Sequence, residues 1–416
     1  MAHIQQDVTP QTMPLPPMDQ TYDVVVIGGG PSGATAAHDL ARKGLSVLLL
    51  DRAGRIKPCG GAIPPRCIRD FDIPANMIVA RVTSARMVAP SAVGVDMPID
   101  NGYVGMVDRE HFDEWLRVRA AESGAQRLTG TFEGLTRDAD GVAVLDIQPK
   151  SSHEPLMQVR ARMVIGADGA VSAVARAAMP EAERVPFVFA YHEIVRAPTT
   201  PNPHYDAKRC DVIYQGQVSP DFYGWIFPHG DTISIGTGSA HKGFSLRGSI
   251  ATLRKETGLD QLETIRKEGA PIPMKPLKRW DNGKDVILAG DAAGVVAPAS
   301  GEGIYYAMFC GRLAAEAVQE ALAASTIKGQ AKALAGARKR FMAAHGTVFW
   351  VLGLLQYFWY RNDKRREQFV KICRDPDVQK LTWDSYMNKE LVRGKMMTHV
   401  RIFFNDVRHL MGFAKA

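Results

Sequence analysis

Residues 22 to 52 read YDVVVIGGGPSGATAAHDLARKGLSVLLLDR, and this stretch decides the fold. An apolar run leads into glycines, small residues follow at helical spacing, and a second apolar run ends in an acid. The glycines Gly28, Gly30 and Gly33 complete the spacing G-x-G-x-x-G. Such a turn lets a pyrophosphate approach the backbone at the N-terminus of a helix. The pattern therefore predicts a strand, a helix and a strand that together bind a dinucleotide.

An acidic residue follows at the distance that a dinucleotide site requires. Asp51 ends the second apolar run 23 residues after Gly28. A carboxylate at this position can accept hydrogen bonds from a ribose diol. Arg52 follows it directly, and we include both residues among the candidates for cofactor binding. The alternative is a structural glycine turn in an unrelated α/β protein, but the acid at this spacing favours the dinucleotide site.

The composition indicates a folded protein whose basic charge lies near the C-terminus. The chain has 416 residues, of which 46% are hydrophobic and 23% are charged, which is ordinary for a globular protein. The formal net charge is +7, and from Arg338 onward 16 lysines and arginines stand against 7 acids. No zinc-finger, helix-turn-helix or RNA-recognition signature accompanies this excess, so we expect no nucleic-acid partner. An anionic membrane surface or an anionic ligand explains it equally well.

The cysteines and the N-terminal residues indicate a cytoplasmic protein. The five cysteines form an odd set without a C-x-x-C pair, which fits neither a disulfide framework nor a metal site and indicates a reducing compartment. Residues 1 to 20 contain neither a basic n-region nor an apolar h-region. We therefore expect them to form a flexible leader without a secretion signal.

Two later stretches resemble the second and third nucleotide motifs of the flavoprotein group that includes aromatic hydroxylases. MVIGADGAVSAVAR, residues 163 to 176, places Asp168 between a short strand and a helix. DVILAGDAAGVVAPASGEGIYYAM, residues 285 to 308, holds four candidate cofactor-binding residues: Gly290, Asp291, Gly301 and Gly303. Three motifs in this order imply that the dinucleotide is FAD. The resemblance also implies that Asp291 hydrogen-bonds the ribityl chain and that the helix after Gly303 points at the pyrimidine edge of the flavin.

An arginine at the start of a predicted helix resembles another element of the same group. MVDREHFDEWLRVRAAESG, residues 106 to 124, has an amphipathic pattern that begins at Arg109. The resemblance implies that Arg109 contacts the flavin phosphates. The alternative is a solvated residue at the start of a helix.

Residues 220 to 228 carry aromatic side chains at alternate positions. They contain the pattern P-x-x-Y-x-W-x-F-P, which resembles the substrate-cavity signature of geranylgeranyl reductases, enzymes that saturate isolated double bonds of a polyprenyl chain. The resemblance implies that Tyr223, Trp225 and Phe227 bind the substrate. Alternate residues of a strand project from one face, so we call these three residues the aromatic row. From spacing alone, an ordinary sheet core is the favoured alternative.

A second element of these reductases occurs in KPCGGAIPPRCI, residues 57 to 68. Cys59, Gly60 and Gly61 match their Cys-Gly-Gly loop, which the resemblance places beside the flavin. An isolated alkene must receive a proton when the flavin delivers a hydride, and Cys59 is the first candidate for the donor. Tyr223 is the second candidate. A buried structural cysteine is the alternative for Cys59.

The C-terminal region begins with an apolar stretch and a basic cluster. TVFWVLGLLQYFWYRNDKRREQFVKIC, residues 347 to 373, starts with 14 nearly uniformly apolar residues. A spanning helix needs about 20, so we expect this stretch to be too short. Its aromatic residues stand beside arginines and a lysine, which is the composition of a helix in a headgroup layer. We therefore expect peripheral membrane contact. The alternative is a helix that packs on the catalytic domain. The residues concerned are Trp350, Phe358, Trp359, Tyr360, Arg361, Lys364, Arg365 and Arg366.

Together these features predict an α/β protein: a Rossmann-like FAD-binding domain of the aromatic-hydroxylase type, an inserted antiparallel-sheet substrate domain and a helical, basic C-terminal region. The FAD-binding domain is expected at residues 21 to 85, 105 to 180 and 280 to 330. The substrate domain is expected at residues 86 to 104 and 181 to 279. The helical region is expected at residues 331 to 416.

The resemblance to geranylgeranyl reductases covers roughly residues 20 to 400 and is nearest to the bacterial enzymes of bacteriochlorophyll synthesis. It implies an FAD-dependent enzyme that uses NADPH to reduce a geranylgeranyl group, on (bacterio)chlorophyll or as the diphosphate, to phytyl. Three alternatives stay open: an aromatic-type monooxygenase, an archaeal-type reductase of lipid polyprenyl chains, and a non-catalytic flavin or lipid carrier. We expect the protein in the cytoplasm, peripheral to the photosynthetic inner membrane.

Overall fold

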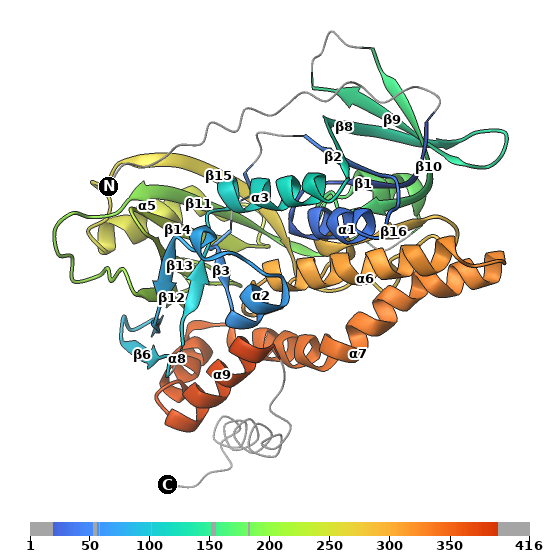
Figure 1. Cartoon of the computed structure of the whole chain (residues 1–416). Helices are drawn as coiled ribbons and strands as arrows, with labels where there is room; N and C mark the ends of the chain where they lie inside the picture. Colours follow the sequence, from blue (N-terminus) through green and yellow to red (C-terminus); the bar gives the residue numbers. More distant parts are fainter. Residues whose placement is uncertain are drawn as a thin grey trace, which may run out of the picture.

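The computed structural model describes residues 20–52, 56–57, 59–100, 102–150, 155–181 and 184–389. Two large sheets lie side by side, and helices from the C-terminal third run along one side of both (Figure 1). Of the leader expected at residues 1 to 20, only Gln20 is among the described residues. The last part of the expected helical region, residues 390 to 416, lies outside them as well.

The first sheet has six strands, and its centre is the parallel set that the first glycine motif predicts. β1 pairs in parallel with β2 and β10, β2 with β8, and β10 with β16, whereas β9 pairs antiparallel with β8 and β10. The central strands are buried on both faces, which explains why their sequences are continuous apolar runs. The strands are β1 (Thr21–Ile27), β2 (Val47–Asp51), β8 (Gln126–Arg137), β9 (Ala143–Pro149), β10 (Met157–Gly166) and β16 (Val286–Leu288).

Helices cover the first sheet and bring the three nucleotide motifs to one edge of it. Helix α1 contacts both α3 and α6, and α6 contacts β10 and β16. The three motifs follow β1, β10 and β16, and the carboxyl ends of these parallel strands lie at the same edge. The helices are α1 (Pro31–Ala41), α3 (Arg109–Glu122), α4 (Ala173–Ala178), η2 (Gly290–Ala293) and α6 (Ile304–Leu322).

The second sheet has seven strands and is antiparallel except for one pair. Its order is β15-β11-β14-β13-β12-β5-β6, and only β12 and β5 pair in parallel. Strand β5 runs across residue 85, where the sequence placed a domain boundary. The strands are β15 (Thr264–Pro273), β11 (Phe187–Arg196), β14 (Thr232–Ser239), β13 (Gly224–His229), β12 (Arg209–Ile213), β5 (Ser84–Val88) and β6 (Gly94–Pro98).

Short elements join the two sheets. Strand β7 pairs with β3 and with β4 in a small third sheet, and α5 packs on β14 and β11 of the second sheet. The small sheet leads directly into α3, so it links the Cys-Gly-Gly loop to the first sheet. These elements are β3 (Ala62–Ile63), α2 (Pro65–Asp70), η1 (Ala75–Met77), β4 (Ala80–Val82), β7 (Val104–Met106) and α5 (Leu246–Glu256).

The C-terminal region is helical, as the sequence predicts. The long helix α7 (Ile327–Trp359) packs on α6, and α8 (Asp363–Ile372) and α9 (Pro376–Asn388) follow beside the second sheet (Figure 1). Phe341, His345 and Phe349 lie on the buried face of α7. The fold class expected from the sequence is therefore confirmed.

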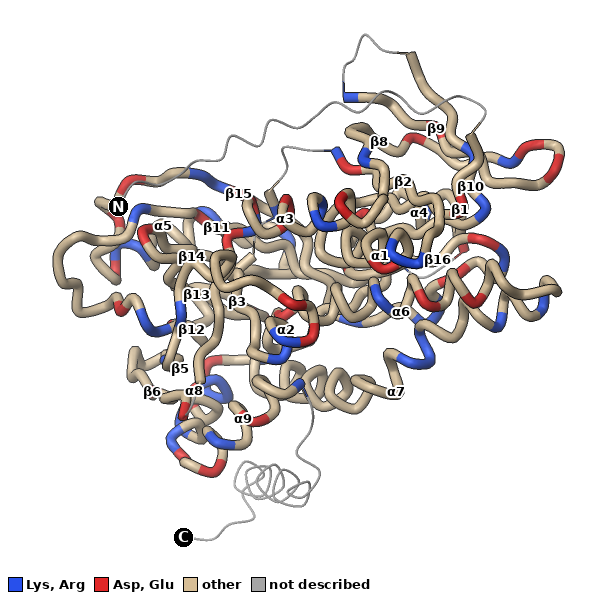
Figure 2. Tube along the Cα trace, in the orientation of Figure 1, with Lys and Arg blue, Asp and Glu red and all other residues tan. Residues whose placement is uncertain are grey.

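The expectation that the apolar C-terminal stretch is too short to span a membrane was wrong. It forms part of the 33-residue helix α7, the one described helix that is long and apolar enough to cross a membrane by length and composition. The apolar run continues on the N-terminal side of residue 347, and Figure 2 shows no charged residue along the second half of α7. Helix length was missed because glycine, histidine and alanine interrupt the hydrophobic pattern without ending the helix.

Candidate active site

Two glycines of the first turn, Gly28 and Gly33, leave no room for a side chain. Gly28 has a φ of +106°, and a Cβ atom there would lie 2.3 Å from the carbonyl oxygen of Ala167. A Cβ atom on Gly33 would lie 1.9 Å from the carbonyl oxygen of Gly28. By contrast, a Cβ atom on Gly30 would meet nothing within 4 Å. The turn is therefore tightly packed on one side, while the backbone at Gly30 faces open space.

The donors at this turn fit the pyrophosphate of a dinucleotide. Helix α1 begins at Pro31 with Gly30 as its N-cap, so its first amide groups are unpaired and carry the positive end of the helix dipole. The buried hydroxyl of Ser32 finds no hydrogen-bond partner among the described residues. A phosphate oxygen would satisfy both the hydroxyl and the amides. These residues therefore suit the phosphates of FAD.

Asp51 reaches the same turn from the end of β2. One of its carboxylate oxygens accepts a hydrogen bond of 2.8 Å from the amide of Gly29. Arg117 of α3 donates to the carbonyl oxygen of Gly29 over 3.2 Å and lies 3.9 Å from Asp51. The sequence did not identify Arg117, because it faces α1 only once α3 has packed. Arg52 is exposed and follows outside the turn.

Gly290 of the third motif packs against Ser32, which follows the first glycine turn. Gly290 has a φ of +63°, and a Cβ atom there would lie 2.7 Å from the Cβ atom of Ser32. Asp291 follows directly, with its side chain 10% exposed and paired to Lys57. The loop of the Cys-Gly-Gly element thus reaches Asp291, which is the residue expected to contact a ribityl chain. Lys57 is a second contact that the sequence did not identify.

The carboxylate of Asp168 accepts hydrogen bonds from the start of α4, the helix that follows it. It accepts hydrogen bonds from the Ser172 hydroxyl at 2.6 Å, from the Ala173 amide at 2.6 Å and from the Val174 amide at 3.2 Å. Burial raises the pKa of the Asp168 carboxyl, against the lowering effect of these bonds. Asp168 therefore accepts hydrogen bonds from the first amides of α4, whose N-cap is Ser172. The second motif brings Ala167, rather than the acid, against the first glycine turn.

The aromatic row begins at Tyr223, directly before β13, and continues along β13 with Trp225 and Phe227. The ring centroids of Tyr223 and Trp225 are 6.2 Å apart, and those of Trp225 and Phe227 are 6.5 Å apart. The Trp225 indole donates a hydrogen bond of 3.0 Å to Ser234 of β14, which fixes the ring against the sheet. The three rings therefore pack in one row. Tyr223 and Trp225 are buried in a hydrophobic cluster of the second sheet, as the sheet-core alternative expects, and Phe227 is partly buried against it.

Each end of the aromatic row contacts a different loop of the first domain. A Cβ atom on Gly60 would lie 2.7 Å from the ring of Phe227, and one on Gly301 would lie 2.7 Å from the Tyr223 hydroxyl. That hydroxyl donates a hydrogen bond of 2.7 Å to the carbonyl oxygen of Ser300. The row thus joins the Cys-Gly-Gly loop to the loop in front of α6. Gly303 lies in the latter loop and is the N-cap of α6.

Cys59 lies beside a buried arginine. Arg109 is 7% exposed, and its guanidinium makes two bonds of 2.7 Å with Asp113 one turn along α3. Burial opposes the charge, but Asp113 and then Cys59 raise the pKa of Arg109 above its ordinary value. The amide of Gly61 also donates to the Cys59 sulfur over 3.3 Å. The structure therefore puts a fixed cation, Arg109, next to the sulfur of Cys59.

Tyr223 has a different environment. It is buried, with 8% of its surface exposed, and burial raises the pKa of its phenol well above the ordinary value. Its proton is held by the Ser300 carbonyl. Of the two candidate proton donors, Cys59 is therefore the one with a charged partner, and Tyr223 is the one with a fixed structural bond.

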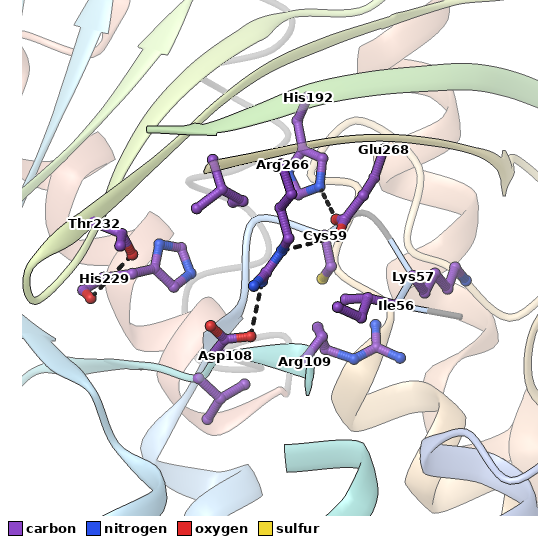
Figure 3. Close-up of a pocket in the computed structure, with 12 residues that line it drawn as sticks. Ile56, Lys57, Cys59, Asp108, Arg109, His192, His229, Thr232, Arg266 and Glu268 are labelled. Carbon is purple, nitrogen blue, oxygen red and sulfur yellow. Dashed lines mark hydrogen bonds and ion pairs between the residues drawn. The ribbon is translucent and has the colours of Figure 1, made fainter. Parts of the chain in front are cut away.

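A small pocket lies beside Cys59, between the second sheet on one side and the Cys-Gly-Gly loop and the start of α3 on the other (Figure 3). His192 and Glu268 approach within 2.5 Å, and Arg266 donates to Asp108 over 2.9 Å. His229 also lines the pocket, and burial lowers the pKa of its imidazole to about 4. Sequence reasoning missed these residues because they come from separate strands and from the N-cap of α3. Asp108 lies in the quoted stretch 106 to 124, and His192, His229, Arg266 and Glu268 lie outside the motifs.

Comparison with known proteins identifies the family of this chain. Residues 21–332 match the family model described as "FAD binding domain". The chain is 57% identical over 391 residues to "Geranylgeranyl diphosphate reductase" of Rhodobacter capsulatus, which covers 94% of this chain and 98% of that protein. It is 31% identical over 323 residues to "Digeranylgeranylglycerophospholipid reductase" of Methanocaldococcus jannaschii, which covers 73% of this chain and 78% of that protein.

The fold is shared with a solved structure. A geranylgeranyl bacteriochlorophyll reductase-like protein from Thermoplasma acidophilum superimposes with a TM-score of 0.76 at 23% identity, over 90% of this chain and 98% of that chain. The order of the nucleotide motifs and the packed glycine turn point to an FAD-binding protein. Both relatives match this chain over most of its length and point to the same family. The chain belongs to the geranylgeranyl reductase family of FAD-binding proteins.

Proposed function

We propose that this protein is an FAD-dependent reductase that saturates the double bonds of a geranylgeranyl group to give a phytyl group. The group is carried by a (bacterio)chlorophyll pigment or by a diphosphate. The observation that carries the proposal is the aromatic row, which joins the Cys-Gly-Gly loop to the loop in front of α6. A line of aromatic faces between two loops of a flavin-binding domain suits a long, flexible alkene. The names of the relatives support the same substrate.

In this proposal the residues of the chain hold the cofactor, orient the alkene and supply a proton. The amides at the start of α1 and the Ser32 hydroxyl bind the phosphates. Bound FAD, once reduced, supplies a hydride to one alkene carbon. Cys59 gives its proton to the other carbon, so that its S–H bond and the N–H bond that held the hydride on the reduced flavin are broken, two C–H bonds form and the double bond is lost. Solvent then restores the proton of Cys59, and Arg109 lies beside the sulfur during this exchange.

The electron donor in this proposal is NADPH. The sequence contains a single G-x-G-x-x-G turn, so the donor has no dinucleotide domain of its own and docks transiently beside the flavin. Anaerobic mixing of the holoenzyme with NADPH, NADH or reduced ferredoxin tests this. NADPH is expected to bleach the flavin fastest. If only reduced ferredoxin bleaches the flavin, the electron donor is ferredoxin, as in the archaeal-type alternative, and not NADPH.

The central experiment follows the mass of the substrate. We expect purified holoenzyme, NADPH and geranylgeranyl-bacteriochlorophyll, kept anaerobic, to yield products heavier by pairs of hydrogens while the flavin cycles. If the product gains oxygen atoms when air is admitted, the protein is a monooxygenase instead. A bound flavin that no polyprenyl substrate reoxidises, including an archaeal-type lipid, would favour the carrier.

We further propose that the protein is cytoplasmic and peripheral to the photosynthetic inner membrane, with α7 as its contact. Trp350 and Tyr357 of α7 are each 69% exposed, and Leu354 between them is partly exposed. The guanidinium of Arg361 lies over the Tyr357 ring, and that of Arg365 over Phe358. Three apolar side chains on one helix face, beside arginines, suit the interface of an anionic bilayer. Trp359, Tyr360 and Arg366 are buried, so the sequence was wrong to group them with the surface residues.

Flotation with anionic vesicles tests this contact. The variant with Trp350→Ser and Tyr357→Ser is expected to lose vesicle binding at low salt. Ile327→Ser is a matched control, because Ile327 is 79% exposed on the first turn of the same helix, away from the basic cluster. Equal binding by all three proteins would contradict the proposal.

A further inference from the structure

A fully buried ion pair lies at the turn that opens α6. The ammonium of Lys389, at the end of α9, is 2.8 Å from a carboxylate oxygen of Glu302, and the two side chains are 3% and 4% exposed. Glu302 stands between the two glycines of the third motif, Gly301 and Gly303. Its other carboxylate oxygen accepts a hydrogen bond of 3.0 Å from the amide of Tyr305 in the first turn of α6. The pair therefore connects the last described helix to the start of α6.

Stability alone is a poor reason for this pair. Removing two charges from water costs free energy that their attraction often fails to recover, and an apolar pair of similar size is frequently as stable. Lys389 also adopts a φ of +53°, a left-handed conformation that is unfavourable for a side chain with a Cβ atom. Its ammonium lies 4.0 Å from the centre of the Tyr386 ring, which partly compensates for the lost water. A buried pair of this kind is best suited to fixing a conformation.

The conformation that it fixes is that of residues 297 to 303, which we call the flavin-side loop. Ala299 has a φ of +62° without being a glycine, so the loop needs outside contacts to keep its shape. The Tyr360 hydroxyl donates to the Ala299 carbonyl over 2.7 Å, and the Tyr223 hydroxyl donates to the Ser300 carbonyl over 2.7 Å. The C-terminal helices and the aromatic row therefore hold this loop together with Lys389.

The charge of Glu302 gives Lys389 a second task. By the family resemblance, the N-terminus of α6 faces the pyrimidine edge of the flavin, where its dipole favours the anion formed on reduction. A carboxylate in the preceding turn opposes that effect, and an ammonium at 2.8 Å cancels it. Because the two charges of the pair cancel, the dipole of α6 is the main source of the electrostatic field at the N-terminus of that helix.

We propose that Lys389 is a positioning residue for the flavin: through Glu302 it holds the flavin-side loop in place and neutralises the carboxylate at the N-terminus of α6. This proposal rests on the FAD-binding part of the proposed function and is independent of the alkene chemistry. It makes the C-terminal helices part of the flavin site, although they lie outside the matched FAD-binding region.

Removal of one charge tests the proposal without any polyprenyl substrate. We expect Lys389→Met to raise the dissociation constant for FAD by roughly five- to a hundredfold, the usual range of coupling between linked sites, and to lower the midpoint potential of bound flavin. Lys380→Met on the same helix is the matched control, because Lys380 is exposed and pairs with Asp384 on the surface. The control is expected to leave both quantities unchanged.

A double variant separates neutralisation from simple loss of packing. Glu302→Gln together with Lys389→Met removes both charges, and we expect it to recover most of the FAD affinity and of the midpoint potential. An unchanged affinity and potential in Lys389→Met would overturn the proposal. So would a double variant as impaired as the single one. Thermal unfolding of each apoprotein shows whether a variant has lost its fold, and the double variant keeps the test valid if Lys389→Met unfolds.

Discussion

The ring of Phe227 lies directly on Gly60, so close that a Cβ atom at residue 60 would stand 2.7 Å from two carbons of the ring. One residue belongs to the aromatic row and the other to the Cys-Gly-Gly loop. Their contact fixes the distance between the surface proposed to hold the alkene and the thiol proposed to protonate it. Positions at this contact should therefore affect catalysis more than cofactor binding.

Gly60→Ala tests the contact. The added methyl group must displace either the Phe227 ring or the loop, because the separation of 2.7 Å is shorter than any ordinary carbon contact. We expect turnover of the alkene to fall at least about tenfold, since a misplacement of about 1 Å can cost a hundredfold. FAD affinity should change little. The control is Gly102→Ala, where the nearest atom is 3.9 Å away. Relief by Phe227→Leu in the same chain would confirm the steric cause, and normal turnover in Gly60→Ala would contradict it.

The two candidate proton donors are distinguished by their variants. A general acid contributes about 10²- to 10⁴-fold, so Cys59→Ser is expected to slow alkene reduction by about a hundredfold or more while NADPH still reduces the flavin. Tyr223→Phe removes one bond to Ser300, worth about 1 kcal/mol, and should slow turnover less than about tenfold. Single-turnover reoxidation of reduced flavin measures both. The reverse order of effects would make Tyr223 the donor.

Acid sensitivity is expected from a histidine outside the active site. His345 of α7 lies among the rings of Tyr305, Tyr306, Phe309 and Phe341, and burial lowers the pKa of its imidazole to about 4. The unfolded chain binds this proton below about 6.5, while the folded protein binds it only near 4. Acid therefore favours unfolding across this window, by up to about 1.4 kcal/mol for each pH unit.

His345→Leu should remove this term. The melting temperature of the variant is expected to fall less than that of the wild type between pH 7 and pH 5. His229, whose pKa is also lowered to about 4, remains in both proteins, so some sensitivity persists. Parallel curves for the two proteins would show that His345 contributes nothing.

The sequence predicted the parts of the site that depend on local spacing. The glycine turn at Gly28 and the alternation of Tyr223 and Trp225 each lie within one strand and one turn, where the backbone period fixes the direction of side chains. Asp168 shows what local spacing does not predict. The motif correctly put it between a strand and a helix, but its carboxylate hydrogen-bonds Ser172 at the start of α4. The ion pair of Glu302 and Lys389 could not be inferred from the sequence. The two residues are far apart in the chain and come together only when α9 packs beside the start of α6, which no local spacing pattern indicates.

Arg109 offers the most direct chemical test of the site. Its guanidinium lies beside Cys59 and makes two bonds of 2.7 Å with Asp113. Arg109→Gln combined with Asp113→Asn removes the cation beside Cys59 without leaving a buried charge unpaired. We expect this double variant, loaded with FAD, to reduce the alkene several-fold more slowly than the wild type. Arg117→Gln, also loaded with FAD, is the control, since Arg117 contacts Gly29 at the nucleotide turn instead. Alkene reduction by the double variant at the rate of the wild type would mean that Arg109 serves only to pair with Asp113.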